Sequence, residues 1–197
     1  MRKFFIIIGI IICKIGLVSG QNLEIHSSLG SFSIPNGKRV EAPTSGSNVN
    51  LGFYYQLNKH WSIGIDLNRS SNNYYRESMA GFQLPLEGTI ISDHFSFLIN
   101  KKITLPHSII LEGGIGLGIF VDMENYFMPV YYDEDEQDYR GVYNVDEYSK
   151  GITFPAQFSV RKEFSNKVSI GIEAGAFYDQ FLNNRGLYFG PRVSYYL

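Results

Sequence analysis

The chain has 197 residues, which suits one domain of ordinary size and is short for two. Its composition is rich in Gly, Tyr and Phe and favours strands separated by turns, and the charged fraction of 18% is low for a soluble domain. The formal net charge of −2 excludes the strongly basic balance of nucleic-acid-binding proteins, so no nucleic-acid partner is expected.

Residues 1–20 have the pattern of a secretory signal peptide. Arg2 and Lys3 give a positively charged start, an unbroken apolar run covers 4–12, and small residues at 18–20 offer a cleavage site. A membrane-spanning helix needs about 20 apolar residues, so this run is too short to be one. The pattern therefore predicts export of the chain.

The expected mature part, residues 21–197, forms a single domain. A lipoprotein site at Cys13 is an alternative to cleavage before 21, but Ile12 stands where such sites have a small residue. Without the first twenty residues the chain carries 14 basic and 19 acidic residues, a formal charge of −5, and no cysteine. With no disulfides, its stability must come from closed strand pairing and burial.

After the leader, apolar and polar residues alternate with a period of two, and no stretch of useful length has a helical period. The clearest run is 61–68, where Trp61, Ile63, Ile65 and Leu67 share one face. Similar alternation predicts strands at 48–57, 109–119, 152–161, 168–176 and 187–197. Weaker runs near 22–33 and 89–101 bring the number of predicted strands to eight.

The connections between these runs alternate in length. Short ones are expected at 58–60, 102–106, 165–167 and 183–184, and long ones at 34–46, 70–87 and 122–149. Outer-membrane barrels have short turns on the periplasmic side and longer loops outside. With an even number of strands, both ends of the chain are expected in the periplasm.

The direction of the apolar face distinguishes a membrane barrel from a soluble one such as a lipocalin. The polar face consists mainly of Gly, Ser, Asn and Gln, which suits a narrow lumen better than a water-washed exterior. Aromatic residues also gather at the predicted strand ends, as they do at membrane interfaces; they are Tyr54, Tyr55, Trp61, Phe164, Tyr195 and Tyr196. These features and the export signal predict an eight-stranded antiparallel up-and-down transmembrane β-barrel.

The whole mature chain resembles the small outer-membrane β-barrels of Gram-negative bacteria, of the eight-stranded OmpA/OmpX-like type. Its last strand, 188–197, is similar to the C-terminal signal read by the barrel-assembly machinery, although Leu197 stands in place of the usual terminal Phe. The Ile-, Asn- and Tyr-rich composition also resembles Bacteroidota sequences. The resemblance implies an outer-membrane location in contact with lipid, with no catalytic motif and no cofactor.

Several charged residues fall on the predicted lumen face, namely Glu112, Arg161, Glu163, Glu173 and Arg192. With turns at 165–167 and 183–184, Glu173 faces Ser159 and Ser194, and both arginines are its diagonal neighbours. The cluster could be a gate or blocked pore, or a structural salt network that fills the barrel. We favour the salt network, because buried charges must be paired.

The segment 122–149 is expected to be a long, acidic, Tyr-rich extracellular loop. Its candidate contact residues for a macromolecular partner are Tyr131, Tyr132, Asp133, Asp135 and Asp138. Clustered carboxylates can bind Ca²⁺, but the EF-hand pattern needs a glycine where Asp138 stands. A solvated acidic loop without a metal is the expectation.

Three functions are compatible with the sequence. The first is a non-enzymatic surface anchor that contacts a macromolecule through the 122–149 loop, and the second is a narrow pore gated by the lumen charges. The third is a lipid- or peptide-modifying enzyme that uses His94 with Ser92 or Ser96. Asp93 points to the opposite face of its strand from His94 and cannot orient it, so enzyme activity is not expected.

Overall fold

The computed structural model describes residues 22–34, 45–76, 86–133, 138–165 and 167–197. The expected signal peptide at 1–20 lies outside the described residues. Among those described, no helix has the length and apolar character needed to cross a membrane.

Eight strands make up nearly all of the described chain. They are β1 (Leu23–Ser33), β2 (Ser45–Gln56), β3 (Trp61–Arg76), β4 (Leu86–Leu105), β5 (Ile109–Asp133), β6 (Asp138–Ser165), β7 (Val168–Asp179) and β8 (Asn184–Tyr196). A short 3₁₀ turn, η1 (Pro106–Ser108), joins β4 to β5.

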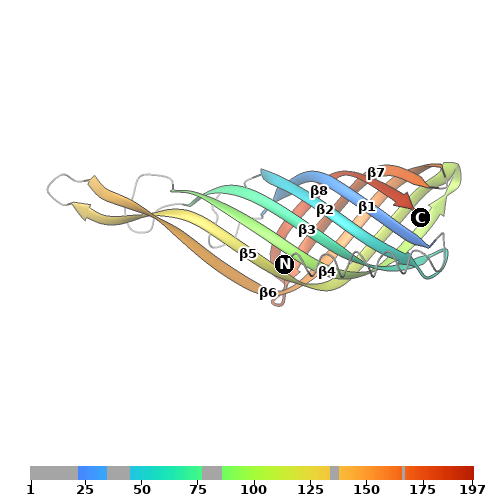
Figure 1. Ribbon diagram of the computed structural model, residues 1–197, viewed down its shortest axis with the longest axis horizontal. Helices are drawn as coiled ribbons and strands as arrows, with labels where there is room; N and C mark the ends of the chain where they lie inside the picture. The colour runs from blue at the N-terminus through green and yellow to red at the C-terminus, as the bar shows by residue number, and fades with distance from the viewer. Residues whose placement is uncertain (1–21, 35–44, 77–85, 134–137, 166) are drawn as a thin grey trace.

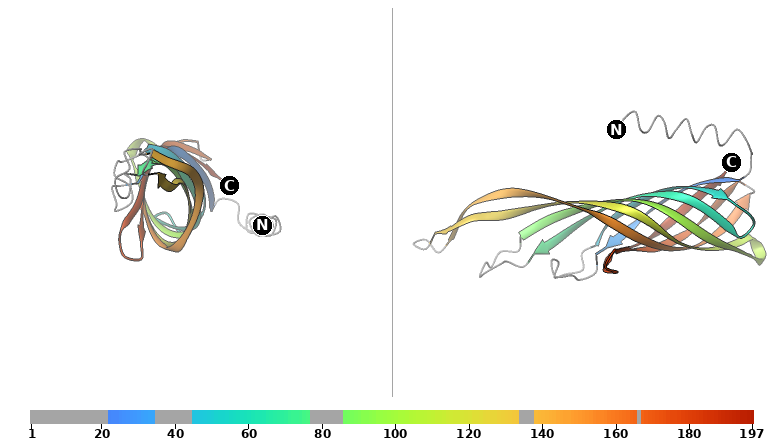
Figure 2. Two further views of the ribbon diagram at one scale, coloured as in Figure 1. Left: turned by 90° about the vertical axis from the view of Figure 1, so that its left-hand side faces the viewer. Right: turned by 90° about the horizontal axis from the view of Figure 1, so that it is seen from below.

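The strands form one closed barrel in which each pairs with its neighbours in the chain (Figure 1). All the pairings are antiparallel, and the ring closes where β1 pairs with β8, with Glu24 opposite Tyr196 and Ser33 opposite Leu187. The view along the barrel shows the closed ring (Figure 2). The predicted all-β, eight-stranded up-and-down barrel is confirmed.

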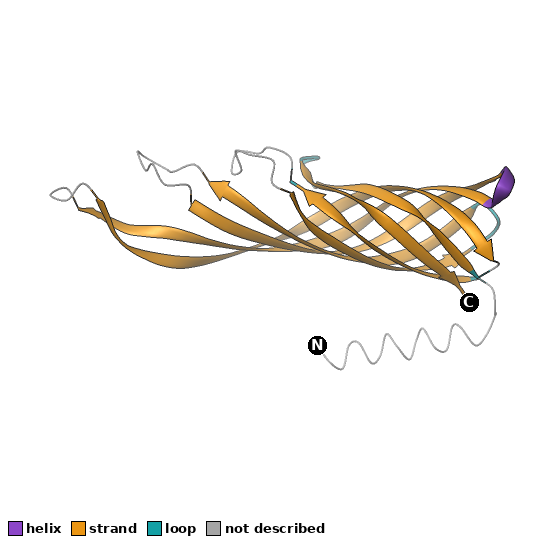
Figure 3. Ribbon diagram, turned by 90° about the horizontal axis from the view of Figure 1, so that it is seen from above, coloured by secondary structure: helices purple, strands orange, loops and turns teal. Residues whose placement is uncertain are grey.

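The expected long loop at 122–149 is wrong, because most of it is strand. Residues 122–133 extend β5 and residues 138–149 extend β6, and the two continue to pair as far as Asp133 opposite Asp138. Figure 3 shows this hairpin reaching well beyond the other strands. Period-two alternation failed as a signal here because a projecting hairpin has no buried barrel wall to keep one of its faces apolar.

Two of the short connections also differ from the expectation. The β4–β5 turn lies at 106–108 and not at 102–106. The β7–β8 turn spans residues 180–183, where the Asp179 Oδ1 atom accepts hydrogen bonds from the backbone N–H groups of Phe181 (2.8 Å) and Asn183 (2.9 Å). The Asp179 carboxylate thus closes a turn longer than the predicted two-residue one.

The barrel is apolar outside and polar inside. Ile115 of β5, for example, is 71% exposed on the outer wall, whereas Glu112 of the same strand is 2% exposed and faces the lumen. Tyr54 and Tyr196, which were listed among the strand-end aromatics of a membrane interface, point into the lumen. They do so because adjacent residues of a strand face opposite sides, so Tyr55 and Tyr195 take the outward positions.

Gly171 faces the lumen at a point where the neighbouring strand lies too close to leave room for a side chain. It lies opposite Arg161 of β6 and Arg192 of β8. A Cβ atom at this position would lie 2.0 Å from the Val160 carbonyl oxygen and 2.4 Å from the Arg161 Cα. These are backbone atoms and cannot turn aside, so a side chain at 171 would force the strands apart.

Replacing Gly171 with Ala should therefore lower the free energy of unfolding by about 1–3 kcal/mol, the usual cost of overpacking. Gly113→Ala is the matched control, because a Cβ there meets no other atom closer than 4.0 Å. The control should be neutral or stabilise slightly. Urea titration of the refolded protein measures both variants, and equal stability of the two would contradict this account of the lumen.

Candidate functional site

Arg192 of β8 lies at the centre of a buried cluster of ion pairs. Its Nη2 atom is 2.9 Å from Glu24 Oε1 and 3.2 Å from Glu112 Oε1, and its Nη1 atom is 2.7 Å from Glu173 Oε2. Its Nε atom donates a hydrogen bond to the Ser194 hydroxyl at 3.2 Å. One guanidinium group thus neutralises carboxylates from three other strands.

Arg161 of β6 completes the cluster. It pairs with Glu24 and, through Nη2, with Glu112 Oε2 at 2.7 Å. Glu24 and Glu112 each contact both arginines, so the four side chains form a closed ring of ion pairs. We call these four residues and Glu173 the arginine cluster; each is only 1–2% exposed. At this degree of burial the ion pairs are poorly screened by solvent, and each charge depends on its partners.

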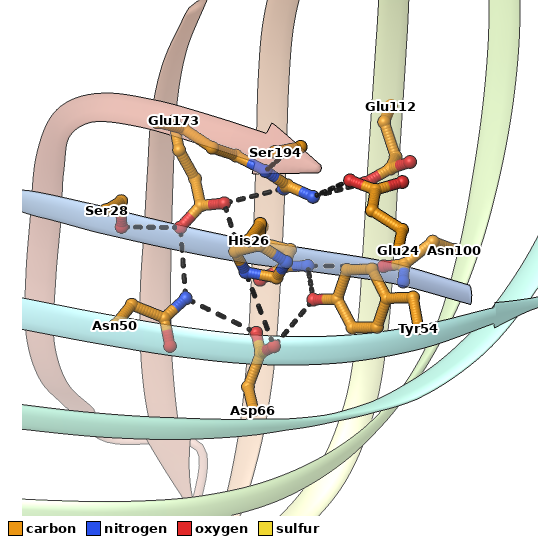
Figure 4. A network of polar contacts seen from close by, with 12 residues as sticks. Glu24, His26, Ser28, Asn50, Tyr54, Asp66, Asn100, Glu112, Glu173 and Ser194 are labelled. Carbon is orange, nitrogen blue, oxygen red and sulfur yellow. Dashed lines mark hydrogen bonds and ion pairs between the residues drawn. The ribbon is translucent and has the colours of Figure 1, made fainter. Parts of the chain in front are cut away.

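A second tier of hydrogen bonds lies beside the arginine cluster (Figure 4). Asn50 donates to Glu173 Oε1 at 3.1 Å, and Tyr54 donates its hydroxyl hydrogen to Asp66 Oδ1 at 2.8 Å. Gln157 in turn donates to the Tyr54 hydroxyl at 2.6 Å and to Asn100 Oδ1 at 3.2 Å. The two tiers together draw side chains from all eight strands.

His26 lies beside this second tier. Its Nε2 atom is 3.6 Å from Asp66 Oδ1 and 3.9 Å from Glu173 Oε2, and its ring is tilted against the Tyr54 ring at 4.7 Å. Four carboxylates and two guanidinium groups therefore meet in this part of the lumen, with the imidazole between two of the carboxylates. Carboxylates outnumber the arginines, which makes each arginine harder to replace than each glutamate.

Aromatic rings fill the part of the lumen nearer the long hairpin. The His94 ring stacks on the Phe177 ring at 3.9 Å, and Phe177 stacks on Tyr188 at 5.5 Å. The Arg185 guanidinium lies 4.2 Å from the centre of the Phe120 ring and pairs with Asp122. The described lumen is thus filled with polar side chains at one level and with rings at the next.

The structure brings four of the five predicted lumen residues together. Glu112, Arg161, Glu173 and Arg192 belong to the arginine cluster, whereas Glu163 is half-buried near the β6–β7 turn and takes no part in the cluster's ion pairs. Glu173 does face Ser159, but its partner on β8 is Gly190 and not Ser194.

The longer β7–β8 turn shifts the predicted register on β8, yet Arg192 remains a diagonal neighbour of Glu173, because it pairs with Gly171. Arg161 turns away from Glu173 toward Glu24 and Glu112. Glu24 was missed by the sequence analysis because the first strand was only weakly marked. The alternation of Glu24, His26 and Ser28 on one face was a usable signal.

The candidate contact residues of the hairpin lie on its two strands. Tyr131, Tyr132 and Asp133 belong to β5 and Asp138 to β6, with Asp133 paired to Asp138. The structure describes the backbone of these four, and Asp135 lies outside the described residues.

His94, the hydrolytic candidate, is buried among aromatic side chains. Its ring is sandwiched against Phe177, and Asp93 faces outward, where its Oδ1 atom is 3.4 Å from Arg69 Nε. Within the described ranges, no three His, Cys, Asp or Glu side chains are grouped so that they could hold a metal ion.

No family model matches the chain, and no curated protein matches it. Solved structures share its fold at low sequence identity. The attachment invasion locus protein Ail of Yersinia pestis is 10% identical with a TM-score of 0.52, covering 91% of this chain and all of its own length. Neisserial surface protein A is 9% identical with a TM-score of 0.52, over 89% of this chain and 97% of that one.

The outer membrane protein OprG of Pseudomonas aeruginosa is 11% identical with a TM-score of 0.52, covering 90% of this chain and 93% of its own. At these identities the likeness establishes the fold, which is that of small eight-stranded outer-membrane barrels.

The excess of carboxylates predicts unequal effects of two substitutions in the arginine cluster. Arg192→Gln leaves three glutamates with one arginine and should cost about 3–5 kcal/mol, the usual loss when a buried ion pair is broken. Glu173→Gln leaves Arg192 with two carboxylates and should cost less.

Urea titration of the refolded protein measures both changes. Lys150→Gln is the control, because this lysine is exposed on the hairpin. A larger loss of unfolding free energy for Glu173→Gln than for Arg192→Gln would contradict the argument from the excess of carboxylates in the cluster.

Proposed function

We propose that the protein spans the bacterial outer membrane as a filled barrel and that the β5–β6 hairpin is its contact surface for a macromolecule outside the cell. The observation that carries this proposal is the length of the hairpin, which extends past both neighbouring strands. On this proposal the protein is an anchored interaction protein and not an enzyme.

The outer wall supports the membrane placement. Large apolar side chains cover every strand on the outside, among them Leu29, Leu51, Ile65, Phe97, Ile115, Phe158, Ile172 and Phe189. Such a surface would aggregate in water, whereas a bilayer is the solvent that it matches. The closed barrel satisfies its backbone hydrogen bonds internally, as hydrocarbon requires. The fold shared with three outer-membrane proteins agrees with this placement, as does the export signal expected at 1–20.

The β2–β3, β4–β5 and β6–β7 turns and both ends of the described chain lie at one end of the barrel, and the hairpin lies at the other, together with the β7–β8 turn (Figure 1). We assign the short-turn end to the periplasm, since outer-membrane barrels have their longer connections outside. The hairpin then projects away from the cell.

The hairpin offers a backbone edge to a partner. The ladder between β4 and β5 ends at Gly88 opposite Tyr126, and the ladder between β6 and β7 begins at Thr153 opposite Asp179. In the described ladder, 138–152 pairs only with β5. An edge of this kind can accept an extended segment of another chain by strand addition.

The charge of the hairpin indicates the chemistry of the partner. Residues 122–149 contain nine acidic residues and one basic residue, Arg140. Asp146 and Glu147 are exposed, and Tyr148 is 67% exposed. Such a surface favours a basic partner, because complementary charge guides association and suppresses the wrong contacts.

A gated pore has less support than this interaction role. The arginine cluster and the rings around Phe177 fill the lumen at two levels, and a conducting path would require both to move. The barrel interior therefore serves as structural filling, and the function lies outside the membrane.

The membrane placement predicts that Ile65→Arg is destabilising in lipid. Ile65 is 40% exposed on the outer wall between Phe53 and Phe97. An arginine facing lipid near the bilayer centre costs about 2–4 kcal/mol. Tyr148→Arg places the same side chain on the hairpin and should be neutral. A protein that refolds without detergent or lipid, and in which Ile65→Arg costs nothing, would be a soluble barrel.

The interaction role predicts that shortening the hairpin weakens binding and spares the barrel. Residues 127–144 can be replaced by Asn-Gly, because Tyr126 and Val145 are paired and a two-residue turn can join them. The probe is a labelled peptide of alternating Lys and Val. We expect the full protein to bind it in a salt-sensitive manner and the shortened one to bind at least about tenfold more weakly.

Fluorescence anisotropy measures the binding, and the gel mobility of unheated samples verifies that the shortened barrel is folded. Undiminished binding by the shortened protein would overturn the contact role of the hairpin. Ion conductance of the full protein in a planar bilayer would favour the pore instead.

A further inference from the structure

Exposed lysines gather at the short-turn end of the barrel. Lys59 lies on the β2–β3 turn, Lys101 on β4, Lys162 on β6 and Lys167 on the β6–β7 turn, and all four are exposed. We call these residues the lysine rim. Glu163, an acidic neighbour, is half-buried, and its partner Ser169 faces the lumen. The outer surface of this end is therefore basic, in contrast to the acidic hairpin at the other end.

Two of these lysines lie against aromatic rings. The Lys101 Nζ atom is 5.7 Å from the centre of the Trp61 ring, and the Lys162 Nζ atom is 5.8 Å from that of Phe164. Trp61 and Phe164 are 42% and 64% exposed on the outer wall. Aromatic residues of this kind occupy the interface between lipid and water. The ammonium groups are consequently held at the depth of lipid head groups.

Beside Lys101 the outer wall has a glycine, Gly113, and therefore no side chain at that position. Lys101 and Phe158 are the partners of Gly113 on its two neighbouring strands. A Cβ built at Gly113 would meet only the Gln157 carbonyl oxygen and Phe158 Cδ2, each at 4.0 Å. The strip of wall at Gly113, between Lys101 and the Phe158 ring, thus carries no side chain of its own.

We propose that Lys101, Trp61 and the bare strip at Gly113 form a binding site for an anionic phospholipid of the surrounding leaflet. The Lys101 ammonium holds the phosphate, the Trp61 ring packs against the glycerol region, and one acyl chain lies over Gly113 toward Ile115. This inference rests on the proposed membrane placement and is independent of the role proposed for the hairpin.

The choice of an anionic lipid follows from charge complementarity. An interfacial lysine attracts anionic lipid with an energy that corresponds to about a fivefold enrichment. A zwitterionic head group would gain less, because its own cation would face the lysine rim. Lys59 lies close to the same site, since the backbone N–H of Lys102 donates to the His60 carbonyl oxygen at 2.7 Å.

The chain carries its own reporter, because Trp61 is its one tryptophan. The protein is refolded into vesicles of a fixed mixture of phosphatidylcholine and phosphatidylglycerol. In one preparation the phosphatidylglycerol has brominated acyl chains, and in the other the phosphatidylcholine has them. Bromine quenches tryptophan on contact, so the two preparations report which lipid lies beside Trp61 while the composition stays constant.

We expect brominated phosphatidylglycerol to quench Trp61 about fivefold more than its share of the mixture predicts. Lys101→Gln should remove this preference. Gly113→Val should reduce it without any change of charge, because the new side chain fills the strip. Lys150→Gln removes one positive charge on the hairpin and should keep the full preference.

Quenching in simple proportion to composition in the unmodified protein would overturn the site, as would a preference that survives Lys101→Gln. A preference that survives Gly113→Val would overturn the placement of the acyl chain. Absence of quenching by either lipid would refute the membrane placement itself.

Discussion

The narrowness of an eight-stranded barrel is the constraint on which the rest of this structure depends. Its interior is too small to remain an aqueous channel and must be filled by side chains. In this protein charged side chains fill part of the lumen. Two arginines and two glutamates form a ring of ion pairs, and Glu173 pairs with Arg192 outside that ring. Polar filling in turn frees the apolar residues for the outer wall. Each strand therefore alternates polar residues that face the lumen with apolar residues that face outward.

In a filled barrel the side chains that stabilise the wall lie in the lumen, whereas the proposed contact surface lies outside it on the hairpin. The interior links all eight strands through side-chain hydrogen bonds and ion pairs, so the wall is rigid where it crosses the proposed bilayer. The hairpin leaves this wall at Tyr126 and Thr153 and continues with pairing only between its own strands. The position of the acidic contact surface is therefore set by a continuous pair of strands anchored in the barrel, and not by a loop of variable shape.

The sequence predicted the number of strands and the face of each strand, because period two is a property of the extended backbone. The turns carried less information: the Asp179 carboxylate lengthens the last one, and the register on β8 shifted accordingly. The hairpin was missed, since alternation disappears where neither face is buried. The partners of Arg161 were also beyond prediction, because a long side chain can reach several carboxylates and the choice depends on packing across Gly171.

The closing seam of the barrel gives this network a role in folding. Glu24 is on the first strand and Arg192 on the last, and they meet only when β1 pairs with β8. An open sheet that lacks β8 would hold Glu24, Glu112 and Glu173 with Arg161 as the one guanidinium group of the cluster. Such an intermediate cannot enter a lipid phase without exposing uncompensated charge. Closure of the ring and neutralisation of these buried carboxylates are therefore coupled, because Arg192 reaches Glu24 only across the seam between β1 and β8.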